Sequence, residues 1–406
     1  MKILFIHHGN AKAGATLSLL GLMQGLSKLG VDCIMACHDV EAREFYSQYG
    51  FMTENVNVTL YPHTCGAWYP FWNVRGMLRL LRWWSIFPSA SRDLQNLIKR
   101  IQPDIVHLNS LTLAPYLPII SAMKVRAVLH VRERLHTGTF GIRSNWLRGI
   151  VKEHASHIIC ICRDNLDALI PNDSKASVVY NPVDLSIFNP NNDCSDLNKE
   201  LGISAHKPIL LFVGGSDVII KGIHILTAAL GRLKRRNVNC TCLFVGMQME
   251  SSNSLWPTIR RAVANLLCIY SARQKFQRKV KKLDIEDMVL PRPFVRNIEQ
   301  YYALADIVVI PFIKPHFARQ VIEAGAMAKP VVASRIGGIE EVVHSSKTGL
   351  LVEPGNPAML AAAIETLLLD PSLSKRMGEA GQAIAIEKYD AAISAKQVYD
   401  IYRTLF

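Results

Sequence analysis

The chain has 406 residues, half of them hydrophobic and 19% charged, and its formal net charge is +13. This length exceeds one ordinary hydrophobic core and predicts a globular protein of two domains. No apolar run reaches the roughly 18–20 residues that span a bilayer, and the basic excess favours partners that carry phosphate or other anions.

The first half of the chain alternates short apolar runs with amphipathic segments. We expect a helix over 14–29 and strands over 3–7, 32–36, 105–109, 128–131 and 157–162. This alternation is typical of a parallel sheet with helices on both faces, in which ligands bind at the carboxyl ends of the strands. Since Met1-Lys2 leads directly into the first predicted strand, we expect no signal peptide. The nine cysteines are predicted to be free thiols in a reducing cytoplasm.

A glycine loop follows the first predicted strand. Gly9, Gly14, Ala15 and Thr16 share the glycine spacing of a phosphate-binding loop, but Ala15 stands where a nucleoside triphosphatase needs its lysine. A loop that leads into a helix N-terminus can still approach an anion or a sugar closely, although a plain strand-to-helix turn would also explain it. We predict that this loop lies on the acceptor side of a binding site.

His130 ends another predicted strand in the first half and precedes a charged run. A single histidine is often structural. At the carboxyl end of a strand it can also donate a hydrogen bond to a substrate hydroxyl or phosphate. His107 offers a weaker version of the same argument.

A second alternating series follows the turn-rich segment 181–192. We expect strands over 209–213, 241–245, 307–310 and 331–334. The predicted fold class is therefore α/β, with two doubly wound Rossmann-like domains, residues 1–185 and 205–390, that face each other across a cleft. The final helical stretch, 391–406, is expected to pack back onto the first domain.

The second series carries residues suited to a nucleotide. Lys221 follows a strand that ends in a glycine pair, and it is either a point charge for a diphosphate or an ordinary surface lysine. Glu323, predicted at the start of a helix, has a carboxylate that can accept two hydrogen bonds from a ribose diol. Gly337 and Gly338 are predicted to turn into a second helix at 340–341, whose N-terminus would present free backbone N–H groups.

The sequence contains no Asp-x-Asp spacing that would let two carboxylates hold a divalent metal on a diphosphate. We therefore expect no metal and no other cofactor, and the leaving group must be neutralised by basic side chains and helix termini. No stacked-aromatic module for nucleic acid is present in the sequence either, so nucleic acid is not an expected partner.

Residues 68–84 contain four of the six tryptophans in the chain. Arg75, Arg79 and Arg82 fall on one helical stripe, and the apolar residues fall on another, namely Met77, Leu80, Leu81 and Trp84. Two interpretations are equally consistent with this pattern. The segment is either an interfacial helix that contacts an anionic membrane or a surface helix that packs its apolar face on its own domain.

Together these segments resemble the family-4 glycosyltransferases of the GT-B fold over nearly the whole chain. The resemblance rests on Asn181-Pro-Val-Asp184 with Phe188 and Pro190, on 301–311, on Glu323-Ala324 with Gly337-Gly338, and on Gly349–Val352. It implies a retaining enzyme that moves a sugar from a nucleoside-diphosphate donor to a glycan or lipid-linked acceptor. It also implies a place in cell-envelope polysaccharide or glycolipid synthesis, in the cytoplasm or on the inner face of the membrane.

The resemblance also implies roles for single residues. Glu323 matches the second glutamate of the family's Glu-x7-Glu motif, which binds the ribose, and His130 matches a histidine beside the donor sugar and phosphate. Lys221 would neutralise the diphosphate, so that His130, Lys221 and Glu323 are the predicted catalytic residues. The remaining predicted donor-binding residues are Gly215, Ser216, His316, Phe317, Ala318, Arg319, Gly337 and Gly338.

The chain departs from the family's pattern at two positions. Pro315 stands where the first glutamate of the motif contacts the transferred sugar, and Ser216 stands near a position that usually holds an arginine. Arg319 and Arg335 are the candidates to replace that arginine. These departures leave two alternative functions open, a non-catalytic nucleotide-sugar binding or scaffold protein and a nucleotide-sugar epimerase on the same fold.

Overall fold

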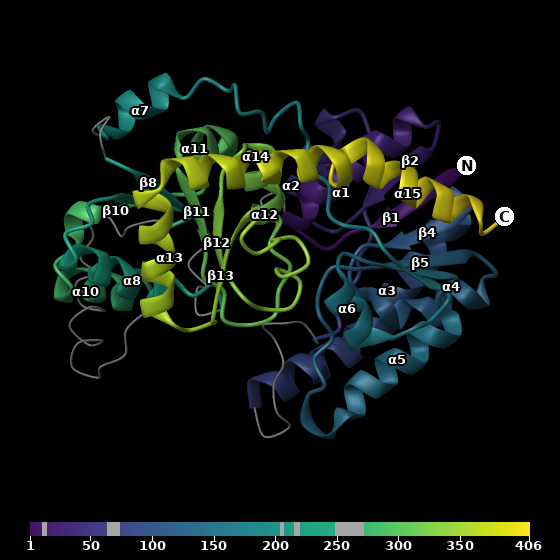
Figure 1. Ribbon diagram of the computed structural model, residues 1–406. Helices are drawn as coiled ribbons and strands as arrows, with labels where there is room; N and C mark the ends of the chain where they lie inside the picture. The colour runs from purple at the N-terminus through teal and green to yellow at the C-terminus, as the bar shows by residue number, and fades with distance from the viewer. Residues whose placement is uncertain (10–13, 63–73, 204–206, 215–219, 248–271) are drawn as a thin grey trace. The chain divides into compact units, whose positions relative to one another are not determined.

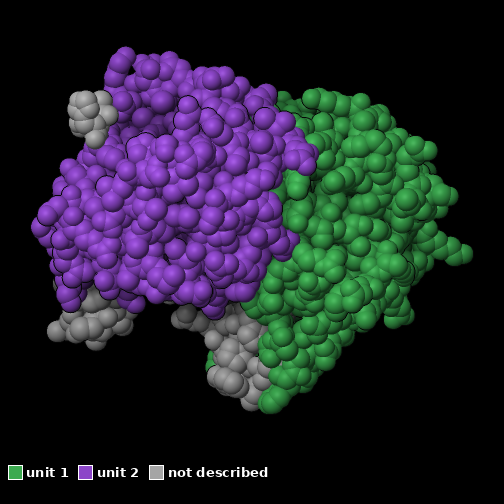
Figure 2. Space-filling model, in the orientation of Figure 1, with its two compact units in different colours: residues 1–184, 388–406 green, residues 185–387 purple. Residues whose placement is uncertain are grey.

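The computed structural model describes residues 1–9, 14–62, 74–203, 207–214, 220–247 and 272–406. These residues form two compact units, residues 1–184 with 388–406 and residues 185–387 (Figure 2). Each unit contains one sheet whose paired strands all run parallel (Figure 1). In the part of the chain described, no helix combines the length and apolar character needed to cross a bilayer.

The sheet of the first unit has seven strands in the order β3-β2-β1-β4-β5-β6-β7. The strands are β1 Lys2–Ile6, β2 Asp32–Ala36, β3 Met52–Glu54, β4 Ile105–Leu108, β5 Arg126–Val131, β6 His157–Cys160 and β7 Ala176–Val178. The helices are α1 Gly14–Lys28, α2 Val40–Gln48, α3 Val74–Ile101, α4 Leu117–Ala122, α5 Ile142–His154, α6 Arg163–Leu169 and α15 Ala391–Arg403, with 3₁₀ turns η1 Leu111–Tyr116 and η2 Thr139–Gly141.

The central strands are mostly apolar and mostly buried because both faces of the sheet are covered. All four residues of β4 are buried, as are four of the five in β1. The strand positions were therefore predictable from short continuous apolar runs, and the predicted bounds of β1, β2, β4, β5 and β6 agree with the structure to within two residues.

The C-terminal helix α15 packs against α1 in the first unit (Figure 1). Ala395, Val398 and Tyr402 are buried in the same cluster as Ile3 and Phe5 of β1. The helices approach so closely at Gly25 that a Cβ added there would lie 2.4 Å from the Cβ of Ala395. The last turns of the chain therefore contribute side chains to the interior of the first unit.

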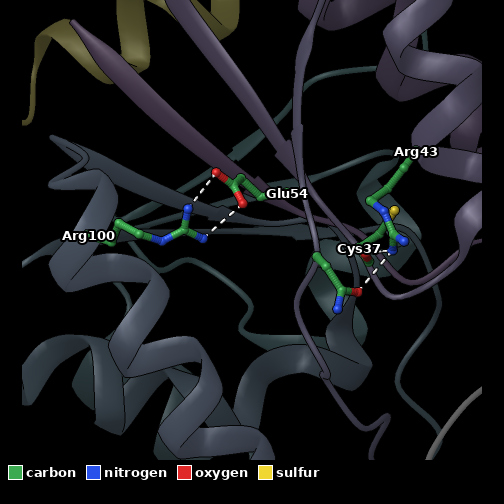
Figure 3. Close-up of polar contacts among 5 residues, drawn as sticks. Cys37, Arg43, Glu54 and Arg100 are labelled. Atoms are coloured by element: carbon green, nitrogen blue, oxygen red, sulfur yellow. Dashed lines mark hydrogen bonds and ion pairs between the residues drawn. The ribbon is translucent and has the colours of Figure 1, made fainter.

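Two arginines hold the short outer strand β3 (Figure 3). Arg100, from the last turn of α3, donates from both terminal nitrogens to the Glu54 carboxylate at 2.9 and 2.8 Å. Arg43 of α2 donates to the Cys37 carbonyl at 2.8 Å and to Asn55 Oδ1 at 3.0 Å. The bidentate pair fixes the direction of approach as well as the distance.

The sheet of the second unit has six strands in the order β10-β9-β8-β11-β12-β13. The strands are β8 Ile209–Val213, β9 Thr241–Val245, β10 Val289–Arg292, β11 Ile307–Ile310, β12 Val331–Ser334 and β13 Gly349–Val352. The helices are α7 Ser195–Leu201, α8 Ile223–Arg235, α10 Ala272–Lys282, α11 Ile298–Leu304, α12 Arg319–Ala326, α13 Pro357–Leu369 and α14 Pro371–Lys388, with the 3₁₀ turn η3 Glu286–Met288.

The prediction of a helix at 340–341 was wrong. Residues 336–343 form consecutive hydrogen-bonded turns, in which Ile339 and Glu340 both donate from their backbone N–H to the Ile336 carbonyl. The turns end at Val342 and Val343, whose branched side chains are buried and disfavour a continued helix. This segment therefore presents the N–H groups of turns rather than a helix N-terminus.

Both sheets reverse their strand order at one point, between β1 and β4 in the first unit and between β8 and β11 in the second. In open α/β sheets, ligands bind in the crevice beyond the carboxyl ends of the strands at such a switch point. The residues that follow these four strands are therefore the first place to look for a site in each unit.

Candidate functional site

A buried polar network follows the switch-point strands of the first unit. Arg132 donates from Nε to Asn109 Oδ1 and from Nη1 to Asn181 Oδ1, both at 2.6 Å. Asn109 Nδ2 lies 3.0 Å from His7 Nδ1, and His7 Nε2 lies 2.9 Å from Thr16 Oγ1. Because arginine can only donate, Asn109 Oδ1 accepts and its amide nitrogen donates to His7 Nδ1, which leaves the hydrogen of His7 on Nε2.

The predicted acceptor-side loop is only partly described, since residues 10–13 lie outside the described residues. Gly9 lies so close to the network that an added Cβ would come within 2.5 Å of His7 Nε2. Thr16 is buried, and its carbonyl accepts from the Tyr46 hydroxyl at 3.0 Å. Gly14 and Ala15 begin α1 and are more exposed, so Gly9 and Thr16 are the residues that join this loop to the network.

His130 of β5 lies beside His107 of β4, with 3.2 Å between His130 Nδ1 and His107 Nε2. Burial, reinforced by the charge of Arg132, lowers the pKa of His107 to about 3 and lowers the pKa of His130 well below its usual value. Both rings are therefore neutral at physiological pH. Among the described residues, His130 Nε2 is a buried ring nitrogen without a hydrogen-bond partner.

Glu323 belongs to α12 in the second unit, one turn beyond the first residue of the helix rather than at its start. It is 5% exposed. Its Oε2 accepts from the Tyr302 hydroxyl at 2.7 Å, and its Oε1 accepts from Arg319 Nε at 2.6 Å. Arg319 Nη2 also lies 2.5 Å from Oε1, so Arg319 occupies Oε1 with two nitrogens. Tyr302 and Arg319 thus orient the carboxylate, and the second lone pair of Oε2 is left for a ligand.

Lys221 lies within electrostatic reach of this carboxylate, and His316 lies within reach of Lys221. Burial lowers the pKa of Lys221, against the opposing effect of the Glu323 charge. Burial, together with the charge of Lys221, lowers the pKa of His316 to about 4. Gly338, at φ +82°, lies close to the loop that contains His316 and Phe317. A Cβ added to Gly338 would lie 3.3 Å from the His316 carbonyl and from Phe317 Cα. Four predicted donor-site positions therefore converge at the second switch point.

Of the other predicted donor-site residues, three are neighbours of this cluster in the sequence and two lie outside the described residues. Phe317 and Ala318 are buried at the entry to α12, and Gly337 is partly buried before Gly338. Gly215 and Ser216 lie outside the described residues.

Of the two candidate replacement arginines, Arg319 is paired with Glu323. Arg335 is exposed and lies 3.6 Å from Glu340. Within the described ranges, no three His, Cys, Asp or Glu side chains form a group that could hold a metal ion.

Helix α3 is apolar on two sides. Trp83 is buried, and Leu80 and Phe87 pack against the core. Val74, Leu78, Leu81 and Trp84, spaced by four, three and three residues, are 71%, 59%, 61% and 66% exposed. Arg79 and Arg82 are exposed on the same helix, whereas residues 63–73 and the Arg75 side chain lie outside the description. One apolar side of α3 therefore packs on the unit, while another is exposed. The predicted apolar stripe is divided between these sides, because Leu80 packs against the core and Leu81 and Trp84 are exposed.

Several site residues could not be identified from the sequence. Tyr302 lies in 301–311, which resembles the family's lead into its donor site without giving Tyr302 a role, and Asn109 and Arg132 show no motif spacing. Asn181 belongs to the segment Asn181–Asp184 that carries the resemblance, but the sequence does not indicate its partner Arg132. Tyr402 reaches His107 across 295 residues of sequence. Position after a strand was the one available signal: Asn109 follows β4 and Arg132 follows β5, at the ends where ligands bind, but this does not show that the two residues pair.

Two family models match the chain. The family described as Glycosyltransferase Family 4 matches residues 13–187, and the family described as Glycosyl transferases group 1 matches residues 195–384. Together they leave unmatched only the two ends of the chain and a short segment at 188–194. The first match lies almost wholly in the first unit, and the second match lies in the second unit.

Curated relatives share moderate identity with part of the chain. A D-inositol 3-phosphate glycosyltransferase from Corynebacterium efficiens is 30% identical over 230 residues, which cover 56% of this chain and 50% of that protein. An alpha-maltose-1-phosphate synthase from Mycolicibacterium smegmatis is 29% identical over 273 residues, covering 64% of this chain and 66% of that protein. The chain thus spans between half and two thirds of the length of these relatives.

Solved structures share the fold at lower identity. HepE from Anabaena in complex with UDP has a TM-score of 0.78 at 21% identity, with each chain covered in full. A glycosyltransferase from Rickettsia africae has a TM-score of 0.75 at 19% identity, covering 100% of this chain and 98% of that chain.

Proposed function

Because the chain belongs to the group 1 glycosyl transferases of family 4, with the GT-B type of fold, we propose that it transfers a sugar from a nucleoside-diphosphate donor to a hydroxyl group. The observation that carries this proposal is the convergence of Lys221, His316, Glu323 and Gly338 at the switch point of the second sheet. These residues offer a cation, an oriented carboxylate and a close backbone approach, which suit a nucleotide.

Each residue has a proposed role. The second lone pair of Glu323 Oε2 accepts a hydrogen bond from the ribose diol, and Tyr302 and Arg319 hold the carboxylate in place for it. Lys221 and backbone N–H groups of the loop at His316–Ala318 stabilise the diphosphate as it departs. We further propose that transfer proceeds with retention and without a metal. Of the two residues that interrupt the family's pattern, Pro315 affects the choice of sugar, and Ser216 leaves Lys221 without a neighbouring arginine at the diphosphate.

The acceptor is proposed to bind the first unit near Gly9, Thr16 and His130. The curated relatives are named for inositol 3-phosphate and maltose 1-phosphate, which points to a small phosphorylated acceptor. The exposed apolar side of α3 favours a glycan or lipid-linked acceptor instead, as in cell-envelope synthesis. Assays with a polyol phosphate, a sugar 1-phosphate and a lipid-linked acceptor separate these classes, and the anomeric configuration of the product tests retention.

We predict that UDP or GDP raises the melting temperature of the protein and that this gain depends on the ribose hydroxyls. A ligand at 100 times its Kd stabilises the folded state by about 2.7 kcal/mol. The 2′,3′-dideoxy nucleotide should stabilise the wild type less, and Glu323→Gln should bind the two forms almost equally. Thermal shift titrations measure both.

The matched control is Glu340→Gln, because Glu340 is an exposed glutamate of the same unit; it should keep the preference for ribose. Equal binding of ribose and dideoxy nucleotides by the wild type would contradict the role of Glu323. Nucleotide-sugar binding without transfer to any acceptor would favour the scaffold alternative, and conversion of the donor into its epimer would favour the epimerase.

Peripheral contact with an anionic membrane through α3 is part of the proposal. The exposed apolar stripe with Arg79 and Arg82 matches a surface of acyl chains and anionic headgroups, and each basic residue near such a surface is worth about 1 kcal/mol. We predict that Arg79→Gln with Arg82→Gln weakens binding to phosphatidylserine vesicles roughly 30-fold in co-sedimentation. Lys281→Gln with Lys282→Gln, on the exposed end of α10, should leave it unchanged. Equal binding by the arginine variant and the wild type would remove this part of the proposal.

A further inference from the structure

Three buried side chains of the first unit form a continuous hydrogen-bonded series that ends at His130. The Tyr402 hydroxyl lies 2.6 Å from His107 Nδ1, and His107 Nε2 lies 3.2 Å from His130 Nδ1. Tyr402 and His107 are 0% exposed and His130 is 4% exposed. The series joins the C-terminal helix α15 to two central strands, β4 and β5.

The direction of donation along this series is fixed by the hydroxyl at its start. A neutral imidazole carries one hydrogen, so each ring donates from one nitrogen and accepts at the other. If Tyr402 donates to His107 Nδ1, then His107 donates from Nε2 to His130 Nδ1, and the hydrogen of His130 lies on Nε2. In the opposite direction, the Tyr402 hydrogen would need another acceptor, and among the described residues its hydroxyl has His107 as its one recorded partner.

Burial and the nearby Arg132 keep both rings neutral by lowering their pKa values. Neither ring therefore takes up a second proton, so each keeps one donor nitrogen and one acceptor nitrogen. The first orientation leaves one polar group of the series, the Nε2–H of His130, without a partner in the described part of the protein. The opposite orientation leaves two, the Tyr402 hydrogen and the lone pair on His130 Nε2, so the first is favoured. A buried donor without a partner is costly unless a ligand accepts from it.

We propose that Tyr402 and His107 are positioning residues that fix the tautomer of His130, so that its Nε2–H donates a hydrogen bond to an oxygen of the bound sugar or phosphate. The identity of that ligand rests on the proposed function; the tautomer does not. The C-terminal helix thus influences the site through a hydrogen-bond relay as well as through packing. A positively charged imidazole is not needed, because the relay supplies a neutral donor with a defined direction.

The direct test is ¹⁵N NMR of the full chain labelled at its histidine rings. The signals of His130 are assigned as those lost in His130→Gln. In the wild type we expect a protonated, pyrrole-like shift for Nε2 and an unprotonated, pyridine-like shift for Nδ1. Tyr402→Phe, which removes the one donor that orients the series, should move both shifts towards the average of two tautomers.

The matched control is Tyr399→Phe, which removes a hydroxyl one turn earlier in α15 from a partly exposed tyrosine outside the series. It should leave the His130 shifts unchanged. A pyridine-like Nε2 in the wild type, or unchanged shifts in Tyr402→Phe, would overturn the relay. A purely structural role for Tyr402 would lower the melting temperature without changing the tautomer.

Kinetics then connect the tautomer to the ligand. Tyr402→Phe should lower kcat/KM about three- to tenfold, as expected for one neutral hydrogen bond, while Tyr399→Phe keeps the wild-type value. Normal NMR shifts in a protein that transfers no sugar would contradict the proposed function and leave the relay supported. Active enzyme with the opposite tautomer would contradict the relay alone.

Discussion

Lys221→Met should lower kcat for sugar transfer about 100- to 1000-fold, the usual effect of removing one preorganised group that stabilises developing charge. Methionine keeps an unbranched apolar side chain of similar length. The Lys221 stem packs closely on Gly214, since a Cβ added to that glycine would lie 2.9 Å from Lys221 Cδ. The substitution removes the ammonium group, whose charge interacts with that of Glu323 in the free protein. Single-turnover kinetics, with the enzyme in excess over the acceptor and the donor at saturation, would measure the chemical step directly.

Lys329→Met is the control, because Lys329 is another lysine of the second unit whose pKa burial lowers. Its Nζ donates to the Ala303 carbonyl at 2.8 Å, and it precedes β12, whereas Lys221 follows β8. The two lysines thus lie at opposite ends of parallel strands. Lys329→Met should retain kcat to within a few fold. A comparable loss of kcat in both variants would show that removing any buried lysine charge from the second unit lowers kcat. A normal kcat in Lys221→Met would refute the role assigned to Lys221.

The central strands of both sheets could be predicted because covered parallel strands are mostly apolar. The predicted bounds of β2, β8, β9, β11 and β12 agree with the structure residue for residue. The four outer strands β3, β7, β10 and β13 were not predicted, since each has only three or four residues and is partly exposed. The ends of the central strands then located the histidines and Lys221 before any side-chain geometry was known.

The partners of these residues could not be predicted. Tyr302 orients Glu323 from a helix 21 residues earlier, and Tyr402 reaches His107 from the other end of the chain. Such pairs depend on how helices pack on a sheet, and no local pattern records that packing. The turn at 336–343 was mistaken for a helix because its glutamates and valines fit a helix pattern, whereas its backbone forms only consecutive turns.

Gly222→Ala should destabilise the second unit by about 3–5 kcal/mol, an unusually large effect for adding one methyl group. Gly222 caps the N-terminus of α8 at φ +69°, a left-handed conformation that alanine adopts with strain. An added Cβ would also lie 1.8 Å from the Pro311 carbonyl oxygen. Backbone must therefore move, and the adjacent Lys221 moves with it, so nucleotide binding should weaken as well.

Gly202→Ala separates the cost of the left-handed backbone conformation from the cost of the contact with Pro311. Gly202 has the same left-handed conformation, at φ +61°, at the end of α7 in the same unit, but no heavy atom lies within 4 Å of the position its Cβ would take. It should cost about 1 kcal/mol, the conformational penalty alone. Urea unfolding of both variants, followed by a probe of the second unit, gives the difference. Equal destabilisation would mean that the contact with Pro311 relaxes without cost, and the turn would then not be the rigid element that holds Lys221 against the cluster of His316 and Glu323.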